Sequence, residues 1–384
     1  MKRATRRTLW ASLLVVLVAC LFLGADWLRG LSFVMRAAGL QGTVPRAVAG
    51  WRNSPFETSE FRVPTRHGEV RARLYQPRAV RGHTVVLTSG VHAGGIDEPR
   101  LVKLAQDLAM GGQRVLTPEP PDLLRYEITP RIPDVIEDAA LWALSRDELA
   151  PGGKVDLFGI SFSGGLSVVA AGRPALRDQV ASTLSFGGHG DLPRVLSFLC
   201  SGVLPDGSHL APHDYGVVII LLNVADRLVP PEQVAPLREG ILTFLRASHQ
   251  TQHDGALAEQ TFAKARELQN RMTEPASTLM GYVNTRNVAA LGPLLLPFVQ
   301  SFAADPSLSP ARSPAPASPV YLLHGAGDTV IPAMESVLLA NVLRPHTEVH
   351  QLSTPLISHA EVDGKPGAAD MVRMVGFWSS LLDE

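Results

Sequence analysis

A buried strand that turns directly into a helix at a glycine-bracketed serine is the feature that most constrains this sequence. Residues 154–165 read KVDLFGISFSGG, an apolar run followed by a Gly-x-Ser turn. Such a turn forces its apex residue into a strained backbone conformation, which requires small neighbours. Gly159 and Gly164 meet this requirement, whereas Ser163 stands where a second glycine would be usual. The pattern predicts that the Ser161 oxygen is held clear of a sheet, at the positive end of a helix.

Length and charge limit the classes of protein to which the chain can belong. Its 384 residues, 46% of them hydrophobic, suffice for two units or one elaborated globular domain. A formal net charge of -1, with basic and acidic residues mixed along the chain, provides no basic field for nucleic acid, so we expect no nucleic-acid partner. Cys20 and Cys200 are the two cysteines, which excludes a disulfide framework and leaves the redox compartment undetermined.

The N-terminus, residues 1–28, is predicted to be a signal anchor. Four basic residues within positions 1–7 precede an uncharged stretch of about 18 residues, close to the shortest length that spans a bilayer. The basic flank should stay in the cytoplasm, so we expect a membrane-anchored protein whose body lies on the extracytoplasmic side. A lipoprotein signal at Cys20 and a cleaved or merely buried segment are the alternatives. The apolar run continues past Cys20, which argues against cleavage there.

Short apolar runs separated by helical patterns predict an α/β protein with a mostly parallel central sheet. We interpret residues 29–60 as a tether and residues 61–75 as a half-exposed hairpin. Strands that alternate with helices indicate right-handed βαβ units, with the functional site beyond the carboxyl ends of the strands. The predicted strands contain residues 85–87, 115–116, 155–158, 180–186 and 320–323, and the predicted helices residues 101–110, 133–149 and 368–382.

The alternation of strands and helices stops after residue 191. Residues 192–305 read as several helices, which we interpret as a helical cap inserted into the core. A proline-rich stretch, residues 306–315, is predicted to be a semi-rigid strap that leads back to it. The core would then consist of residues 61–191 and 316–384.

Two segments resemble the α/β-hydrolase superfamily. The strand, turn and helix around Ser161 resemble its nucleophile elbow, G-x-S-x-G, with Ser163 as the departure. Residues 320–332, VYLLHGAGDTVIP, are similar to its acid loop, in which an apolar strand and an HG turn precede Asp328. His359 follows a last predicted strand, and this completes the order Ser, Asp, His that the superfamily uses. A helical cap inserted at this point of the chain also matches the superfamily.

The resemblance implies a serine hydrolase that cleaves carboxylic esters. Ser161 would be the nucleophile, His359 the base and Asp328 the acid that orients it. The backbone N–H groups of Phe162 and Val91 would form the oxyanion hole. Val91 lies in a loop, residues 89–95, where Ser89 replaces the histidine of the superfamily's HG-x motif.

Further residues and partners are also expected. His92 is a second candidate oxyanion donor, and both His92 and His189 are possible substrate contacts, although loop hydrogen bonding would also explain His189. The partner would be a small-molecule acyl substrate, and the cap together with the anchor suggests an apolar or lipid-like one. No cofactor is implied, because the glycines near Ser161 lack a G-x-G-x-x-G arrangement.

Several alternatives remain open at this point. Ser163 could be the nucleophile, and Asp226 could be the acid, although it lies in the insertion and lacks the HG turn. The histidine pairs at 209/213 and 249/253 have a spacing that zinc could use, but neither has a carboxylate at motif spacing, so no metal is expected. Peptidase or acyltransferase chemistry, or an inactive membrane-tethered scaffold, would suit the same fold.

Overall fold

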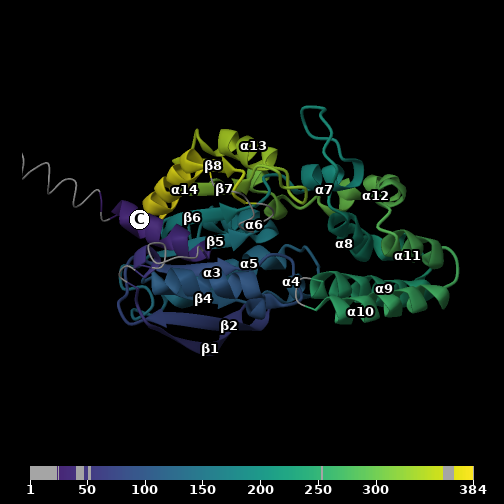
Figure 1. Cartoon of the computed structure of the whole chain (residues 1–384), viewed down its shortest axis with the longest axis horizontal. Helices are drawn as coiled ribbons and strands as arrows, with labels where there is room; N and C mark the ends of the chain where they lie inside the picture. Colours follow the sequence, from purple (N-terminus) through teal and green to yellow (C-terminus); the bar gives the residue numbers. More distant parts are fainter. Residues whose placement is uncertain are drawn as a thin grey trace, which may run out of the picture.

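The computed structural model describes residues 24, 26–39, 47–50, 53–251, 254–357 and 367–383, which build around one eight-stranded sheet. The strand order is β1-β2-β4-β3-β5-β6-β7-β8 (Figure 1). β2 pairs antiparallel with β1 and β4, and the remaining pairs are parallel. The hairpin and the mostly parallel central sheet that the sequence predicts are thus confirmed. The strands are β1 (Phe56–Thr65), β2 (Gly68–Pro77), β3 (Thr84–Thr88), β4 (Arg114–Pro118), β5 (Val155–Ile160), β6 (Val180–Phe186), β7 (Val320–Gly325) and β8 (Val349–Thr354).

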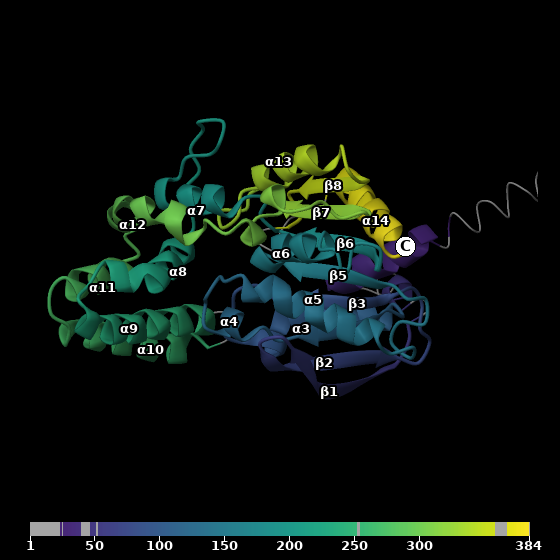
Figure 2. The same cartoon turned by 180° about the vertical axis from the view of Figure 1, so that it is seen from behind.

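Helices cover both faces of the sheet (Figures 1 and 2). Side chains alternate between the two faces of a strand, so the continuous apolar run of β3 is buried only if a layer of helices covers each face of the sheet. Val85 and Leu87 belong to the core shared with the first layer, and Val86 belongs to the core shared with the second. The first layer contains α3 (Pro99–Met110) and α14 (Ala368–Leu381), and the second contains α5 (Arg131–Leu144), α6 (Phe162–Ala171) and α13 (Met334–Leu343).

Residues 192–305, which the sequence predicts to form a cap, contain helices α7 to α12. These helices are inserted between β6 and β7 at one end of the molecule (Figures 1 and 2). Helix α8 lies at the centre of this cap, because residues 217–222 are all buried. That is why its apolar run resembles a strand in the sequence. The cap helices are α7 (Leu192–Ser201), α8 (Asp214–Val224), η2 (Ala225–Arg227), α9 (Pro231–Gln250), α10 (Gly255–Asn270), α11 (Ala276–Asn284) and α12 (Val288–Phe302).

The proline-rich return from the cap is fastened to the end of β6. It contains the short helices η3 (Pro306–Leu308) and η4 (Pro310–Arg312). The imidazole Nε2 of His189 lies 2.7 Å from the carbonyl oxygen of Leu308, and the Ser309 hydroxyl accepts a hydrogen bond from the N–H of Leu192 at 2.9 Å. The strap is therefore held at both the start of the cap and the end of the central sheet.

The N-terminal residues differ from the tether that is expected over 29–60. Residues 26–37 form a helix that packs against α14, where the rings of Phe33 and Trp378 lie 4.2 Å apart, and β1 already begins at Phe56. Of the predicted anchor, residues 1–28, the structure describes only Gly24 and residues 26–28. Within the described ranges, no helix has both the length and the apolar character needed to cross a membrane.

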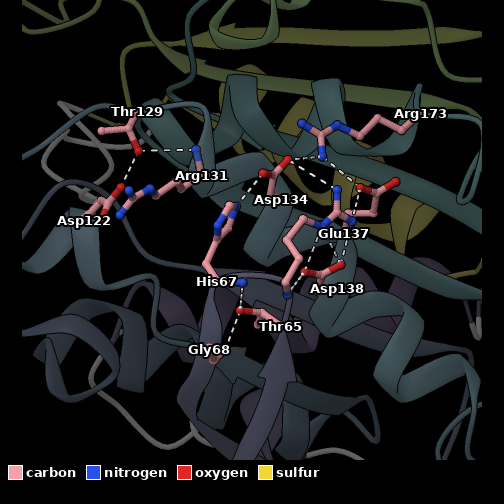
Figure 3. A network of polar contacts seen from close by, with 11 residues as sticks. Thr65, His67, Gly68, Asp122, Thr129, Arg131, Asp134, Glu137, Asp138 and Arg173 are labelled. Atoms are coloured by element: carbon pink, nitrogen blue, oxygen red, sulfur yellow. Dashed lines mark hydrogen bonds and ion pairs between the residues drawn. The ribbon is translucent and has the colours of Figure 1, made fainter.

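A network of charged side chains ties the β1–β2 hairpin to α5 (Figure 3). The guanidinium of Arg66, in the hairpin turn, donates to Glu137 and Asp138 of α5. His67 lies 2.6 Å from Asp134 of the same helix. The edge of the sheet is thereby fixed to the helical layer by ion pairs.

This topology is that of the α/β-hydrolase fold, with a helical cap between β6 and β7. The antiparallel β2 precedes a parallel sheet with helices on both faces. The Gly-x-Ser turn joins β5 to α6, near the middle of the sheet, where its serine reaches the carboxyl edge of the strands.

Candidate active site

Ser161 occupies the strained turn that the sequence predicts. Its backbone angles are φ 56° and ψ -133°, a region that non-glycine residues rarely adopt. The turn leaves no room for a side chain at Gly159, because a Cβ there would lie 2.1 Å from the carbonyl oxygen of Ser163. Ser161 immediately precedes the first turn of α6, where backbone N–H groups and the helix dipole favour developing negative charge.

Ser163 packs inside the molecule, whereas Ser161 lines a cavity. Ser163 is fully buried, and among the described residues its hydroxyl has no hydrogen-bond partner. The close approach between α6 and the end of β6 falls at Gly164, where a Cβ would lie 3.1 Å from the Cα of Gly188. A glycine one position later than usual therefore meets the packing requirement, and the arrangement favours Ser161 over Ser163 as the nucleophile.

The loop that follows β3 passes directly beside Ser161. A Cβ on Gly90 would lie 3.1 Å from the Cβ of Ser161. Val91 and His92, next along this loop, line the same cavity as Ser161 and Phe162. Both predicted oxyanion donors, the N–H groups of Val91 and Phe162, thus belong to segments that meet at the serine.

Asp328 lies in the loop after β7, buried and held in a fixed orientation. Its Oδ1 accepts hydrogen bonds from the N–H groups of Val330 and Ile331, at 2.8 and 3.0 Å. Its Oδ2 is 3.5 Å from Nε2 of His324, and it faces the end of β6, 3.8 Å from the position that a Cβ on Gly187 would take. This geometry suits a carboxylate that orients a base. The predicted base, His359, lies outside the described residues.

Two other sequence hypotheses find different surroundings. His189 is fully buried and does not line the cavity, so hydrogen bonding to the carbonyl of Leu308, and not substrate contact, describes its role. Burial lowers the pKa of His189, more than the hydrogen bond to Leu308 and the nearby acids raise it, which keeps the imidazole neutral. Asp226 lies on the cap with a side chain that is 59% exposed, away from the cavity, so Asp328 is the better candidate for the acid.

The cavity around Ser161 has a volume of about 840 Å³ and is lined by residues of both the core and the cap. Cap helices α7, α8 and α12 contribute apolar walls, and charged side chains of α3 lie on the core side. The apolar lining includes Ile128, Leu196, Leu199, Ile219, Ile220 and Phe302, and the charged lining includes Glu98, Arg100, Lys103 and Asp107.

Three side chains that reach the loop beside Ser161 are not predicted from the sequence to contact it. They are Tyr126, Tyr215 and His249, and the last two come from the cap. The sequence suggests His249 only as half of a zinc pair with His253, which lies outside the described residues. Its contact with His92 joins residues 157 positions apart, so no local spacing could reveal it.

The described residues offer no cluster of three or more histidine, cysteine or acidic side chains arranged to hold a metal ion. The structure therefore places a strained serine beside the two segments that carry the predicted donors, and a buried carboxylate in the loop after β7.

Comparison with solved structures finds similar folds among hydrolases. An esterase from Pyrobaculum calidifontis is 14% identical and has a TM-score of 0.44, with 86% of this chain and 84% of that chain covered. An acylaminoacyl peptidase from Pyrococcus horikoshii is 14% identical, also at 0.44, with 87% and 42% covered. Brefeldin A esterase, a bacterial homologue of human hormone sensitive lipase, is 15% identical, at 0.45, with 92% and 83% covered. No protein-family model and no curated protein matches the sequence.

Proposed function

We propose that this protein is a serine hydrolase that cleaves carboxylic esters through an acyl-enzyme. Ser161 Oγ attacks the acyl carbon while His359 takes its proton, and His359 then returns the proton to the leaving alcohol oxygen. Asp328 orients the imidazole. Water clears the acyl-enzyme, giving one proton to His359, which passes it back to Ser161.

The backbone of Ser161 is the observation that carries the proposal. Strain of this kind, roughly 1–3 kcal/mol, persists only where the surroundings impose it, and it tends to occur at functional sites. Here it places a serine that is 8% exposed at the wall of a large cavity, beside the loop of Val91. A turn with a purely structural role would have no need of the cavity or of the adjoining donor loop.

The cavity walls support an apolar acyl group as substrate. The cap side presents aliphatic and aromatic side chains over Ser161, and burying such surface favours binding by roughly 25 cal/mol per Å². We therefore expect p-nitrophenyl esters of medium or long acyl chains to be hydrolysed with higher kcat/KM than the acetate. The reverse order would contradict an apolar acyl site, and preferential cleavage of the matching anilides would identify a peptidase.

Labelling with a fluorophosphonate probe tests the reaction class. Wild type should be labelled at Ser161, Ser161→Ala should not be labelled, and His359→Ala and Asp328→Ala should be labelled much more slowly. Ser163→Ala is the matched control and should keep the wild-type rate. Loss of labelling in Ser163→Ala alone would move the nucleophile to Ser163, and an unlabelled wild type would identify an inactive scaffold.

We also propose that residues 1–28 anchor the protein, with its body on the extracytoplasmic side of a membrane. The basic flank and the uncharged stretch that follows it support this orientation. Carbonate extraction of membranes should leave the full chain in the pellet and release a chain that lacks residues 1–24. Added protease should reach the body only from the extracytoplasmic side.

A further inference from the structure

The loop beside Ser161, residues 89–95, is held by side chains from three segments outside it. Under the proposed function this loop supplies one of the two oxyanion donors, so its position matters within fractions of an ångström. Apart from one residue of the short helix η1 (Gly95–Asp97), the loop has no regular structure of its own. Its conformation must therefore come from contacts with the rest of the molecule.

Two tyrosines hold the loop on one side. The Tyr126 hydroxyl is hydrogen-bonded to the backbone of Ala93 and to the Tyr215 hydroxyl, which in turn lies 3.5 Å from the carbonyl oxygen of Val91. A carbonyl can only accept, so the Tyr215 hydroxyl is the donor at its contact with Val91. Burial raises the pKa of both hydroxyls, which keeps them protonated, so that Tyr215 can donate to Val91.

Two histidines hold the loop on the other side. The N–H of Gly94 donates to Nδ1 of His92 at 2.9 Å, so a neutral His92 carries its proton on Nε2. That Nε2 lies 2.8 Å from Nδ1 of His249, which must accept the bond. The two rings meet edge to face with centroids 4.1 Å apart. His92 is thus fixed by its own loop on one nitrogen and by the cap on the other.

Two of the side chains that hold the loop, those of Tyr215 and His249, belong to the cap. Tyr215 lies in the first turn of α8, and His249 lies in the last turn of α9. These helices reach the loop from different parts of the insertion, and both residues line the cavity. The cap therefore contacts the loop on two sides and also covers the serine.

We propose that Tyr215 and His249 are positioning residues, through which the cap sets the position of the Val91 N–H beside Ser161. Neither side chain takes part in the chemical step. Removing an oxyanion donor outright lowers kcat by roughly 10²–10³-fold, so displacing one should cost less, about 10-fold for each side chain. The donor stabilises the oxyanion of the transition state more than it stabilises the bound ester. A misplaced donor should therefore lower kcat, while KM changes less than about 2-fold.

Amide hydrogen exchange of residues 91–95 tests the contacts without reference to catalysis. Tyr215→Phe removes one hydroxyl, and His249→Phe removes the acceptor while keeping a ring. Each should speed exchange at Ala93 and Gly94 at least 10-fold. His249→Asn, whose Oδ1 can replace the acceptor, should restore slow exchange. Tyr282→Phe, a cap tyrosine that does not line the cavity, is the control.

Steady-state kinetics of the same variants on a p-nitrophenyl ester complete the test. A fall in kcat with KM retained, and recovery in His249→Asn, would support the positioning role. Unchanged exchange in both variants would overturn it whatever the activity, and so would faster exchange with unchanged kcat. If wild type itself fails to react with esters and with the fluorophosphonate probe, the proposed function fails first, and the positioning role is overturned with it.

Discussion

At the scale of single residues, the backbone around Ser161 is strained and its neighbours prevent relaxation. The Ser161 N–H donates to the carbonyl of Phe186 on β6 at 2.8 Å, and its carbonyl accepts from Gly164 on α6 at the same distance. These bonds join the turn to the neighbouring strand and to the helix that follows it. Gly159 allows β5 and α6 to approach because it lacks a side chain. The strain is therefore confined to one residue and offset by the contacts of the surrounding elements.

We expect Gly159→Ala to destabilise the protein by about 3 kcal/mol or more, because its methyl would overlap the Ser163 carbonyl and backbone would have to move. Gly376→Ala is the matched control. Gly376 lies exposed within α14 with no atom within 4 Å of the place its methyl would take, so alanine should stabilise the helix by about 0.5–1 kcal/mol. Urea denaturation of both variants measures the difference. Equal stabilities would show that the turn can relax.

Single residues also show how far the sequence could predict the site. Ser161 could be placed because the turn imposes a local pattern of small residues. Ser163 is the position that departs from this pattern, and its burial shows that Gly164 takes over the packing. Tyr215 could not be placed, because its contact with Val91 depends on how the cap folds over the core. Residues that are far apart in the chain show no local sequence pattern that would reveal their contact.

At the scale of elements, the β1–β2 hairpin depends on a charged network for its attachment. Arg66 in the hairpin turn and Arg173 after α6 both form ion pairs with carboxylates of α5. Glu137 is 7% exposed and bonds to both guanidinium groups, at 2.7 and 2.8 Å. A carboxylate so buried is costly unless it is paired, so the two arginines are needed together.

Arg173→Ala should destabilise the fold by about 1–2 kcal/mol, between the values typical of exposed and buried ion pairs. The loss leaves Glu137 with Arg66 alone and removes the 2.7 Å bond to Asp134. Arg177→Ala, an exposed position four residues later, should change stability by less than about 0.5 kcal/mol. Thermal unfolding of both variants provides the comparison. Similar melting temperatures would show that the contacts of Arg173 add nothing to the stability of the fold.

The same network predicts a dependence on pH. Burial acts to raise the pKa of Asp134, but hydrogen bonds from His67 and Arg173 outweigh it, so the folded pKa lies below its ordinary value. A lowered pKa stabilises the fold above the unfolded value of about 4, and this gain is lost as pH falls through the folded pKa. Asp134→Asn should therefore be less stable than wild type at pH 7, with a difference that shrinks towards pH 3. Asp178→Asn, at an exposed position, should show no such convergence.

At the scale of the whole molecule, the N-terminal helix and the C-terminal helix lie on the same side. The helix over residues 26–37 packs on α14, at the end of the molecule away from α9 and α10 (Figures 1 and 2). Its last residue, Ala37, lines the cavity around Ser161. The sequence suggests a tether here, because the segment shows no sustained apolar period. Its docking depends instead on a close approach at Gly30, which composition cannot reveal.

Gly30→Ala should loosen this helix from α14. Its methyl would lie 2.6 Å from the carbonyl oxygen of Val375 and 2.8 Å from the backbone nitrogen of Ser379, so the helices must separate. Separation exposes Phe33 and Trp378, which are 1% and 4% exposed in the folded protein. Exposing one large apolar side chain typically lowers the free energy of unfolding by about 1.5–3 kcal/mol. Trypsin should then cut after Arg29 and Arg36 much faster than in wild type.

Gly24→Ala is the control, because nothing lies within 4 Å of a methyl at that position. It should leave both proteolysis and stability unchanged. Since Ala37 lines the cavity, Gly30→Ala should also raise KM for long-chain esters more than for the acetate. Unchanged proteolysis in Gly30→Ala would mean that the helix can shift without leaving α14. In that case the attachment of the N-terminal helix to α14 does not depend on the close approach at Gly30.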